Sequence, residues 1–101
     1  DTTFSSISRK YEELSLLQKS AGEILLAMLE IRNDDVLDLG CGTGSLTRKI
    51  RKLTRGKVVG VDLSAGMIEE ARRRSGADII FEVKSAEELD YENCFDVIFC
   101  N

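Results

Sequence analysis

Hydrophobic residues along the chain recur with two different spacings, which predicts helices and strands in alternation. Between residues 12 and 30 apolar side chains fall three and four positions apart, as on one face of an amphipathic helix. The same spacing predicts a helix over residues 45–54 and another that Ser64 caps and that ends at Gly76. Short apolar runs bounded by turn residues predict strands over residues 36–39, 57–61, 79–83 and 95–100.

This order of elements predicts an α/β fold. Strands that alternate with helices pair in parallel and form a doubly wound sheet. We expect Leu46, Ile50 and Leu53 to face this sheet from one helix, and Met67, Ile68 and Ala71 to face it from the next. The chain divides into an N-terminal helical cap over residues 1–34 and a sheet-containing, ligand-binding domain over residues 35–101.

Composition and charge narrow the range of partners. Fourteen basic and eighteen acidic residues give the chain a net charge of −4. The longest basic run is Arg72-Arg73-Arg74, so nonspecific binding to nucleic-acid phosphates is not expected. No apolar stretch approaches the roughly 20 residues that a membrane helix needs, so we expect no membrane partner. With no histidine present, a zinc site is not indicated, and the expectation is reduced thiols in a cytoplasmic protein at Cys41, Cys94 and Cys100.

A glycine-rich loop follows the predicted strand at residues 36–39 and is the strongest functional signal in the chain. In Gly40-Cys41-Gly42-Thr43-Gly44, glycine at alternate positions lets the backbone approach a ligand where a Cβ would collide. Ligands of open α/β sheets bind beyond the carboxyl ends of the strands, which is where this loop lies. Glycine-rich loops also serve as tight connections, but this density of glycine after a buried strand favours a ligand site.

The spacing in the loop argues against a dinucleotide. The dinucleotide pattern G-x-G-x-x-G needs a third glycine at position 45, where this chain has Ser45, and the third glycine comes one residue early at Gly44. Asp38 precedes the first glycine by two residues. A carboxylate there would oppose a pyrophosphate but suits a cation. The loop therefore favours a ligand that carries positive charge.

A second acidic residue lies at the end of the predicted strand over residues 57–61. Asp62 is placed to accept hydrogen bonds from both hydroxyls of a ribose, or to act as a turn residue that opens the next helix. With the glycine loop upstream, the ribose role is favoured. Leu63 and Met67 would then lie beside a base, although Met67 is nearly as well explained by core packing.

The residues singled out so far resemble those of class I S-adenosylmethionine-dependent methyltransferases. The matching stretches agree in order and spacing, and they are Val36–Gly44, Val58–Arg72, Ser85–Leu89 and Phe95–Asn101. The resemblance implies a Rossmann-like fold of seven strands, of which this chain holds the first four in the order 3-2-1-4. It also implies S-adenosyl-L-methionine as the cofactor, so that residues 35–101 form part of the domain that binds it.

The resemblance assigns roles to individual positions. The residue matching Asp38 supports the methionine end of the cofactor, and the one matching Asp62 binds the ribose. The positions that form the floor of the cofactor site are those of the loop: Gly40, Cys41, Gly42 and Gly44. Those matching Leu63 and Met67 line the adenine, and the backbone of the one matching Asn101 lies near the methionine moiety of the cofactor. Where the family often has an acidic residue that reaches the adenine, this chain has Ser85 and Ala86, so a serine hydroxyl or Glu87 would take that role.

The N-terminal segment is similar to a subgroup of this family. Phe4–Tyr11 followed by Leu17-Gln18 looks like the malonyl-acyl-carrier-protein methyltransferases, in which a tyrosine and a glutamine on such a segment lie over the cofactor. This implies that Tyr11 and Gln18 cover the cofactor here. Tyr11 is explained equally well as an ordinary residue of an amphipathic helix.

The function expected from these features is S-adenosylmethionine-dependent methyl transfer to a small-molecule or carrier-protein-bound acceptor. The catalytic residues stay open, because a carboxylate acceptor needs no general base whereas an amine or hydroxyl acceptor can require one. One alternative is a noncatalytic cofactor-binding or assembly fragment; the other is part of a nicotinamide dehydrogenase, which Asp38 and Ser45 disfavour.

The last predicted strand raises a question of completeness. In the seven-strand fold the strand over residues 95–100 is interior, whereas at the end of this chain it would form an exposed apolar edge that invites pairing. We expect either further chain or a homodimer through this strand. The 101 residues alone are expected to be inactive.

Overall fold

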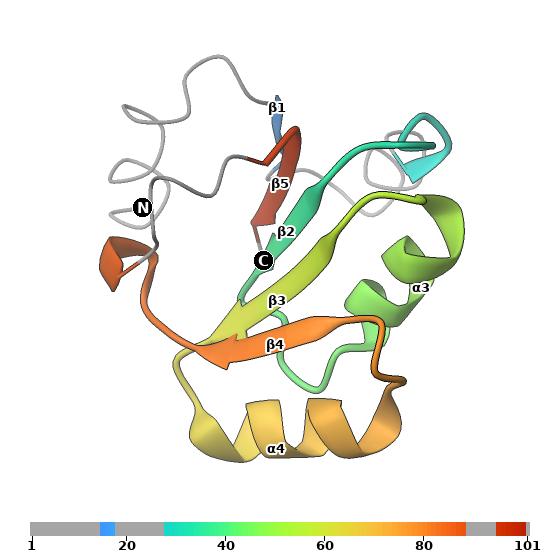
Figure 1. Ribbon diagram of the computed structural model, residues 1–101. Coiled ribbons are helices and arrows are strands. Elements are labelled where there is room, and N and C mark those ends of the chain that lie inside the picture. Colours follow the sequence, from blue (N-terminus) through green and yellow to red (C-terminus); the bar gives the residue numbers. More distant parts are fainter. Residues whose placement is uncertain (1–14, 18–27, 89–94, 101) are drawn as a thin grey trace.

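A computed structural model describes residues 15–17, 28–88 and 95–100 (Figure 1), and the structural statements below refer to these ranges. Their core is a parallel sheet of five strands in the order β1-β5-β2-β3-β4. The strands are β1 (Ser15–Leu17), β2 (Val36–Leu39), β3 (Val58–Asp62), β4 (Ile80–Val83) and β5 (Val97–Cys100).

The other described elements connect these strands. Helix α3 (Ser45–Leu53) joins β2 to β3, α4 (Ala65–Arg74) joins β3 to β4, and the 3-10 turn η1 (Ala86–Glu88) follows β4. The four strands that the sequence predicts occur at the expected places, in the spatial order β4-β3-β2-β5. This is the expected 3-2-1-4 arrangement, so the α/β fold class is confirmed. Neither helix has the length and apolar character that crossing a membrane would require.

The central strands are buried on both faces of the sheet. On one face Val36 of β2 and Val58 of β3 pack against Ile50 of α3 and Ile68 of α4. The alternate residues of the same strands belong to a second buried cluster, formed by Leu37, Leu39, Val59, Val61, Phe95, Ile98 and Cys100. Burial on both faces explains why these strands are almost continuously apolar, as is usual for parallel sheets.

The prediction of one helix over residues 12–30, within the expected N-terminal helical cap, is wrong at Ser15–Leu17. These residues form strand β1 instead. These residues pair in parallel with Val97–Phe99 of β5, which therefore lies between β1 and β2 and is not an exposed edge. The physical reason is that an unpaired strand edge presents hydrogen-bonding groups to any extended segment that reaches it. Near the end of the same predicted helix Met28 is buried, as is Ile31 just after it, in the cluster that includes Ile50 of α3 and Ile68 of α4.

Two side chains that the sequence predicted to face the core, Leu53 and Met67, are exposed, and so is Val83 of a predicted strand. Leu53 is 40% exposed, whereas Thr47 of the same helix is fully buried. Met67 is 45% exposed, although Ile68 beside it is buried as expected. Val83 is also 45% exposed, because β4 is the edge strand and has a neighbouring strand, β3, on one side only. Helical spacing therefore placed Ile50, Ile68 and Ala71 in the core correctly, and its errors are at the margins of the two buried faces.

Gly60 in the middle of β3 leaves room for an aromatic ring. A Cβ at Gly60 would lie 2.9 Å from ring carbons of Phe81 in β4 and 3.1 Å from Sγ of Cys41. We expect Gly60→Ala to lower the free energy of unfolding by roughly 1–3 kcal/mol, because the buried ring must shift. Urea denaturation measures this change. Gly66→Ala in α4 is the matched control, since its Cβ would meet only Oγ of Ser64 at 3.8 Å; equal stability of the two variants would contradict the packing explanation.

Candidate functional site

The glycine loop joins β2 to α3 at the carboxyl end of the sheet. Gly40, Gly42 and Gly44 have φ values of +73°, +58° and +86°. All three lie in the left-handed region, which side chains other than glycine rarely adopt. The amide groups of Gly40 and Cys41 both donate to the carbonyl oxygen of Val61, at 2.9 and 3.0 Å, and hold the loop against β3. The backbone conformation is thus a reason for glycine at these three positions, in addition to the approach of a ligand that the sequence predicts.

Two of the glycines differ in what surrounds them. A Cβ at Gly44 would lie 3.0 Å from the Phe81 ring, so this glycine is required by packing as well as by its φ angle. A Cβ at Gly42 would meet no atom of the described residues within 4 Å. At Gly42 the loop therefore borders open space, and this is the position where bare backbone is available to a ligand.

Asp62 connects the loop to the start of α4. Its Oδ2 accepts a hydrogen bond from the amide of Gly42 at 2.9 Å, and its Oδ1 accepts one from the amide of Ser64, also at 2.9 Å. Ser64 in turn caps α4 by accepting from the amide of Met67 at 3.2 Å, as the sequence predicted. The turn role that the sequence left open for Asp62 is therefore present. A carboxylate has about four acceptor positions, so these two bonds leave capacity for ligand hydroxyls.

Asp38 lies fully buried at the end of β2, next to the loop. Its Oδ2 accepts a hydrogen bond from the hydroxyl of Thr47 at 2.7 Å, which ties β2 to α3. Thr47 did not emerge from the sequence as a site residue. The available signal was a polar residue inside the apolar stripe of residues 45–54, next to Leu46 and three residues before Ile50.

The two described cysteines report on the electrostatics of this region. Burial raises the pKa of the Cys41 thiol to about 12, and the negative charges of Asp38 and Asp62 add to the effect. Burial raises the pKa of Cys100 as well, again with a contribution from Asp38. Both thiols are free and remain protonated at neutral pH, so neither acts as a nucleophile. The same negative charges favour a cation at the loop.

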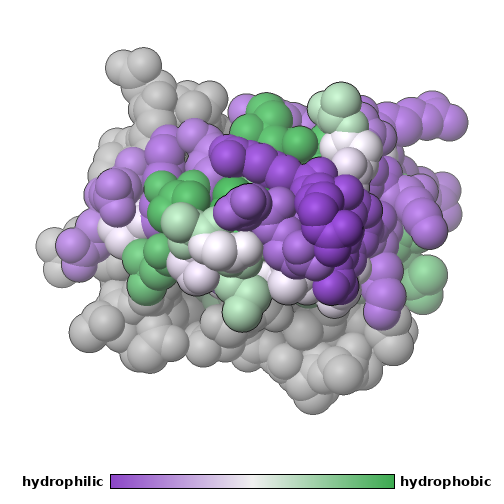
Figure 2. Space-filling view, turned by 90° about the horizontal axis from the view of Figure 1, so that it is seen from below, coloured by the Kyte–Doolittle hydropathy of each residue, from purple (hydrophilic) through white to green (hydrophobic). Residues whose placement is uncertain are grey.

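Two large apolar side chains are exposed where β3 ends and α4 begins. Leu63 is 75% exposed and Met67 is 45% exposed. Core packing, which the sequence left open for Met67, is therefore not its role. Figure 2 shows the face of the molecule that carries α4, where strongly hydrophilic atoms fill the centre and right of the view and hydrophobic atoms lie at the left and along the upper and right edges. Along α4 itself the sequence changes in the same way, from the exposed Leu63 just before the helix to Arg72, Arg73 and Arg74 at its end.

Comparison with known proteins identifies the fold family. Residues 36–101 match the family described as "Methyltransferase domain", and these residues include both the glycine loop and Asp62. The chain belongs to this methyltransferase family. The family match decides against the nicotinamide dehydrogenase alternative.

Individual relatives extend the match beyond this domain. The malonyl-[acyl-carrier protein] O-methyltransferase of Acetivibrio thermocellus is 31% identical over 97% of this chain. The enzyme of the same name from Pectobacterium atrosepticum is 36% identical over 90% of the chain. The chain spans 36% of the length of each of these two enzymes.

Solved structures of methyltransferases with other acceptors share this fold. A dimethyladenosine transferase from Plasmodium falciparum is 30% identical, with a TM-score of 0.67, over 84% of this chain and 33% of that one. Phosphoethanolamine N-methyltransferase 1 from Haemonchus contortus, in complex with phosphoethanolamine and S-adenosylhomocysteine, is 27% identical with a TM-score of 0.68. That similarity covers 78% of this chain and 17% of the other.

This methyltransferase domain is of class I, and its cofactor is S-adenosylmethionine. The surroundings of the loop fit such a molecule. Gly42 borders open space, Asp62 has acceptor capacity for hydroxyls, and exposed apolar side chains lie beside it at Leu63 and Met67. The negative charge of Asp38 and Asp62 suits the positive sulfonium. The structure thus brings the two carboxylates, the loop and the apolar pair together at one end of the sheet.

The remaining predicted site residues fall in two groups. Ser85 lies at the same end of the sheet, because the amide of the preceding Lys84 donates to the carbonyl oxygen of Asp62 at 3.1 Å. The Ser85 amide donates to Oε1 of Glu88 at 2.9 Å, and Ala86 begins the turn η1. The other predicted positions lie outside the described residues, and they are Tyr11, Gln18 and Asn101.

Proposed function

We propose that the protein transfers a methyl group from S-adenosylmethionine to a small-molecule or carrier-protein-bound acceptor. The observation that supports this class of acceptor is the extent of similarity to the malonyl-[acyl-carrier protein] O-methyltransferases. The similarity covers 97% of this chain for the Acetivibrio thermocellus enzyme. It therefore includes residues before position 36, where the match to the general methyltransferase domain begins.

The described residues would bind and orient the cofactor. Asp62 would accept hydrogen bonds from ribose hydroxyls while it holds Gly42 and Ser64 in place. Leu63 and Met67 would flank the adenine with their exposed apolar surfaces. The bound cofactor supplies an activated methyl group, so the protein's chief task is to align the acceptor with it, and a carboxylate acceptor needs no general base. No described residue is assigned a catalytic role.

A methyl-transfer assay with paired acceptors tests this proposal. The protein at its natural length is incubated with S-adenosylmethionine and either a malonyl group on acyl carrier protein or malonyl-coenzyme A. We expect formation of the malonyl methyl ester, detected by mass spectrometry. Transfer to the carrier-bound malonyl group alone would identify the carrier as part of the substrate, whereas transfer to both would indicate a small-molecule acceptor.

The same assay separates the proposal from cofactor binding without catalysis. Binding of S-adenosylhomocysteine without transfer to either acceptor would contradict the proposed acceptor class and favour the noncatalytic alternative. Failure to bind S-adenosylhomocysteine at all would contradict the assignment of the site itself. An Asp62→Asn variant assayed in parallel controls for methylation by a contaminating enzyme.

A further inference from the structure

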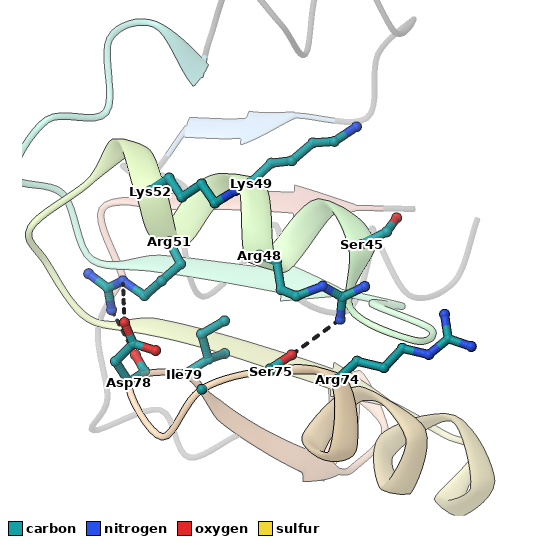
Figure 3. Close-up of a pocket in the computed structure, with 10 residues that line it drawn as sticks. Ser45, Arg48, Lys49, Arg51, Lys52, Arg74, Ser75, Asp78 and Ile79 are labelled. Carbon is teal, nitrogen blue, oxygen red and sulfur yellow. Dashed lines mark hydrogen bonds and ion pairs between the residues drawn. The ribbon is translucent and has the colours of Figure 1, made fainter.

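A basic groove separates α3 from the segment that connects α4 to β4 (Figure 3). Its volume is about 520 Å³, and one end lies at Ser45, the residue that follows the glycine loop. Five cationic side chains line it, and they are Arg48, Lys49, Arg51, Lys52 and Arg74. Arg74 is ion-paired with Glu70 of its own helix, and Asp78 is the one carboxylate among the lining residues, so the excess of positive charge comes from α3. This concentration of positive charge occurs in a chain whose net charge is −4.

Two of the arginines make the walls of the basic groove rigid. The Arg48 guanidinium donates to the hydroxyl of Ser75 at 3.2 Å and so links α3 to the end of α4. The Arg51 guanidinium donates to the carbonyl oxygen of Asp78 at 2.9 Å and links α3 to the segment before β4. A hydroxyl or a carbonyl oxygen carries no net charge, so these bonds fix the arginines without neutralising them. Within the described ranges, the one carboxylate that forms an ion pair with either arginine is Asp78, 3.9 Å from Nε of Arg51.

The lysines of the basic groove are available to a partner. Lys49 and Lys52 are exposed and lie three residues apart on α3, which places them on neighbouring turns of the same face. No hydrogen bond or ion pair joins either ammonium group to another residue of the described ranges. Together with the fixed arginines they form a row of positive charge along the helix.

We propose that the basic groove docks an acidic helix of a partner protein. Carboxylates three and four residues apart on one face of a helix repeat at the same interval as the cations of α3, so the two rows can pair along their length. Because the chain as a whole is negative, an acidic partner is repelled by the rest of the surface and is attracted at this groove. This partner surface goes beyond the proposed methyl transfer.

Other anions fit the basic groove less well. None of its ten lining residues is aromatic, so it offers no surface on which the bases of a single-stranded nucleic acid could stack. The net charge of −4 opposes a long polyanion that would extend past the groove. The free cations stand on exposed side chains rather than in a ring of backbone amides, which is the arrangement that small phosphate sites use.

Peptide binding to matched variants tests this proposal. The probe is a fluorescent alanine-rich helical peptide with glutamates three and four residues apart on one face, and the control peptide carries glutamine at those positions. Lys49→Gln/Lys52→Gln removes the two free cations, whereas Arg32→Gln/Arg55→Gln removes the same charge from exposed positions outside the basic groove. Fluorescence anisotropy at low salt should show roughly tenfold weaker binding for the lysine variant only, the expected effect of two exposed ion pairs.

Each outcome decides the proposal. Equal binding of the glutamate and glutamine peptides, or equal weakening by both double variants, would overturn it. Tighter binding of a short DNA duplex or of inorganic pyrophosphate than of the glutamate peptide would overturn it in favour of a nucleic acid or a small anion. S-adenosylhomocysteine binding, measured on the same samples, should be unchanged in both variants, so a failure of the methyltransferase assignment remains distinguishable.

Discussion

Asp62→Asn is expected to weaken binding of S-adenosylhomocysteine by roughly 10- to 100-fold, the range for losing charge-assisted hydrogen bonds. In the protein the Asp62 carboxylate lies at the carboxyl end of β3 and accepts from the amides of Gly42 and Ser64. The ribose hydroxyls of the ligand would be its further donors. Asparagine keeps a single acceptor oxygen and loses the charge, so it cannot serve the two amides and the ribose together. Isothermal titration calorimetry measures the change in dissociation constant.

The control for this variant is Glu69→Gln. Glu69 is exposed on α4 and its replacement removes the same unit of charge without touching the site. We expect its dissociation constant to match that of the unmodified protein. Similar affinities for the Asp62 and Glu69 variants, with both proteins folded, would show that Asp62 does not bind the ligand and serves only the turn before α4.

Gly42→Ala is expected to weaken cofactor binding more than Gly44→Ala does, and Gly44→Ala is expected to lose more stability. Both replacements force alanine into left-handed backbone, which costs roughly 1–2 kcal/mol in each case. At Gly44 the new methyl group also lies 3.0 Å from the Phe81 ring, so the total loss of stability should reach roughly 2–4 kcal/mol. At Gly42 the methyl group meets no atom of the described residues and instead occupies space that the ligand would use.

Two measurements on each variant separate these effects. Urea denaturation gives the loss of stability, and calorimetry with S-adenosylhomocysteine should show at least roughly tenfold weaker binding for Gly42→Ala than for folded Gly44→Ala, since steric intrusion costs at least 1.4 kcal/mol. Equal affinities for the two variants would place the ligand away from Gly42. The comparison is internal, because the backbone strain is common to both glycines.

Much of the fold is encoded in short stretches of sequence. The apolar run at Val36–Leu39 is β2, with the predicted bounds. Ser64 caps α4, as a serine directly before a helical pattern predicts. The three glycines predicted to form a loop after this strand do so, with left-handed φ angles. These features depend on residues within about four positions of one another, where backbone and side-chain preferences act directly.

Features that join distant parts of the chain could not be predicted in this way. Ser15–Leu17 form a strand because β5 offers them a free edge, and Val97, the partner of Ser15, lies far along the sequence. Thr47 is buried because its hydroxyl donates to Asp38, although the apolar spacing of the helix predicts that Leu46 and not Thr47 faces the sheet. In each case a hydrogen bond that folding brings within reach outweighs a local preference, and such bonds leave no periodic mark on the sequence.

The features of the candidate site likewise divide into those that the sequence predicts and those that depend on the tertiary structure. By itself the sequence determined which chemical groups are present: the glycine loop, the carboxylates of Asp38 and Asp62, and the apolar pair Leu63 and Met67. Only the tertiary structure decided that Asp62 holds the loop through Gly42 and that Met67 is exposed rather than buried. It also decided that cations from α3 and α4 share one groove. The reason is that parallel strands place their carboxyl ends, and the helices between them, side by side whatever their separation in sequence.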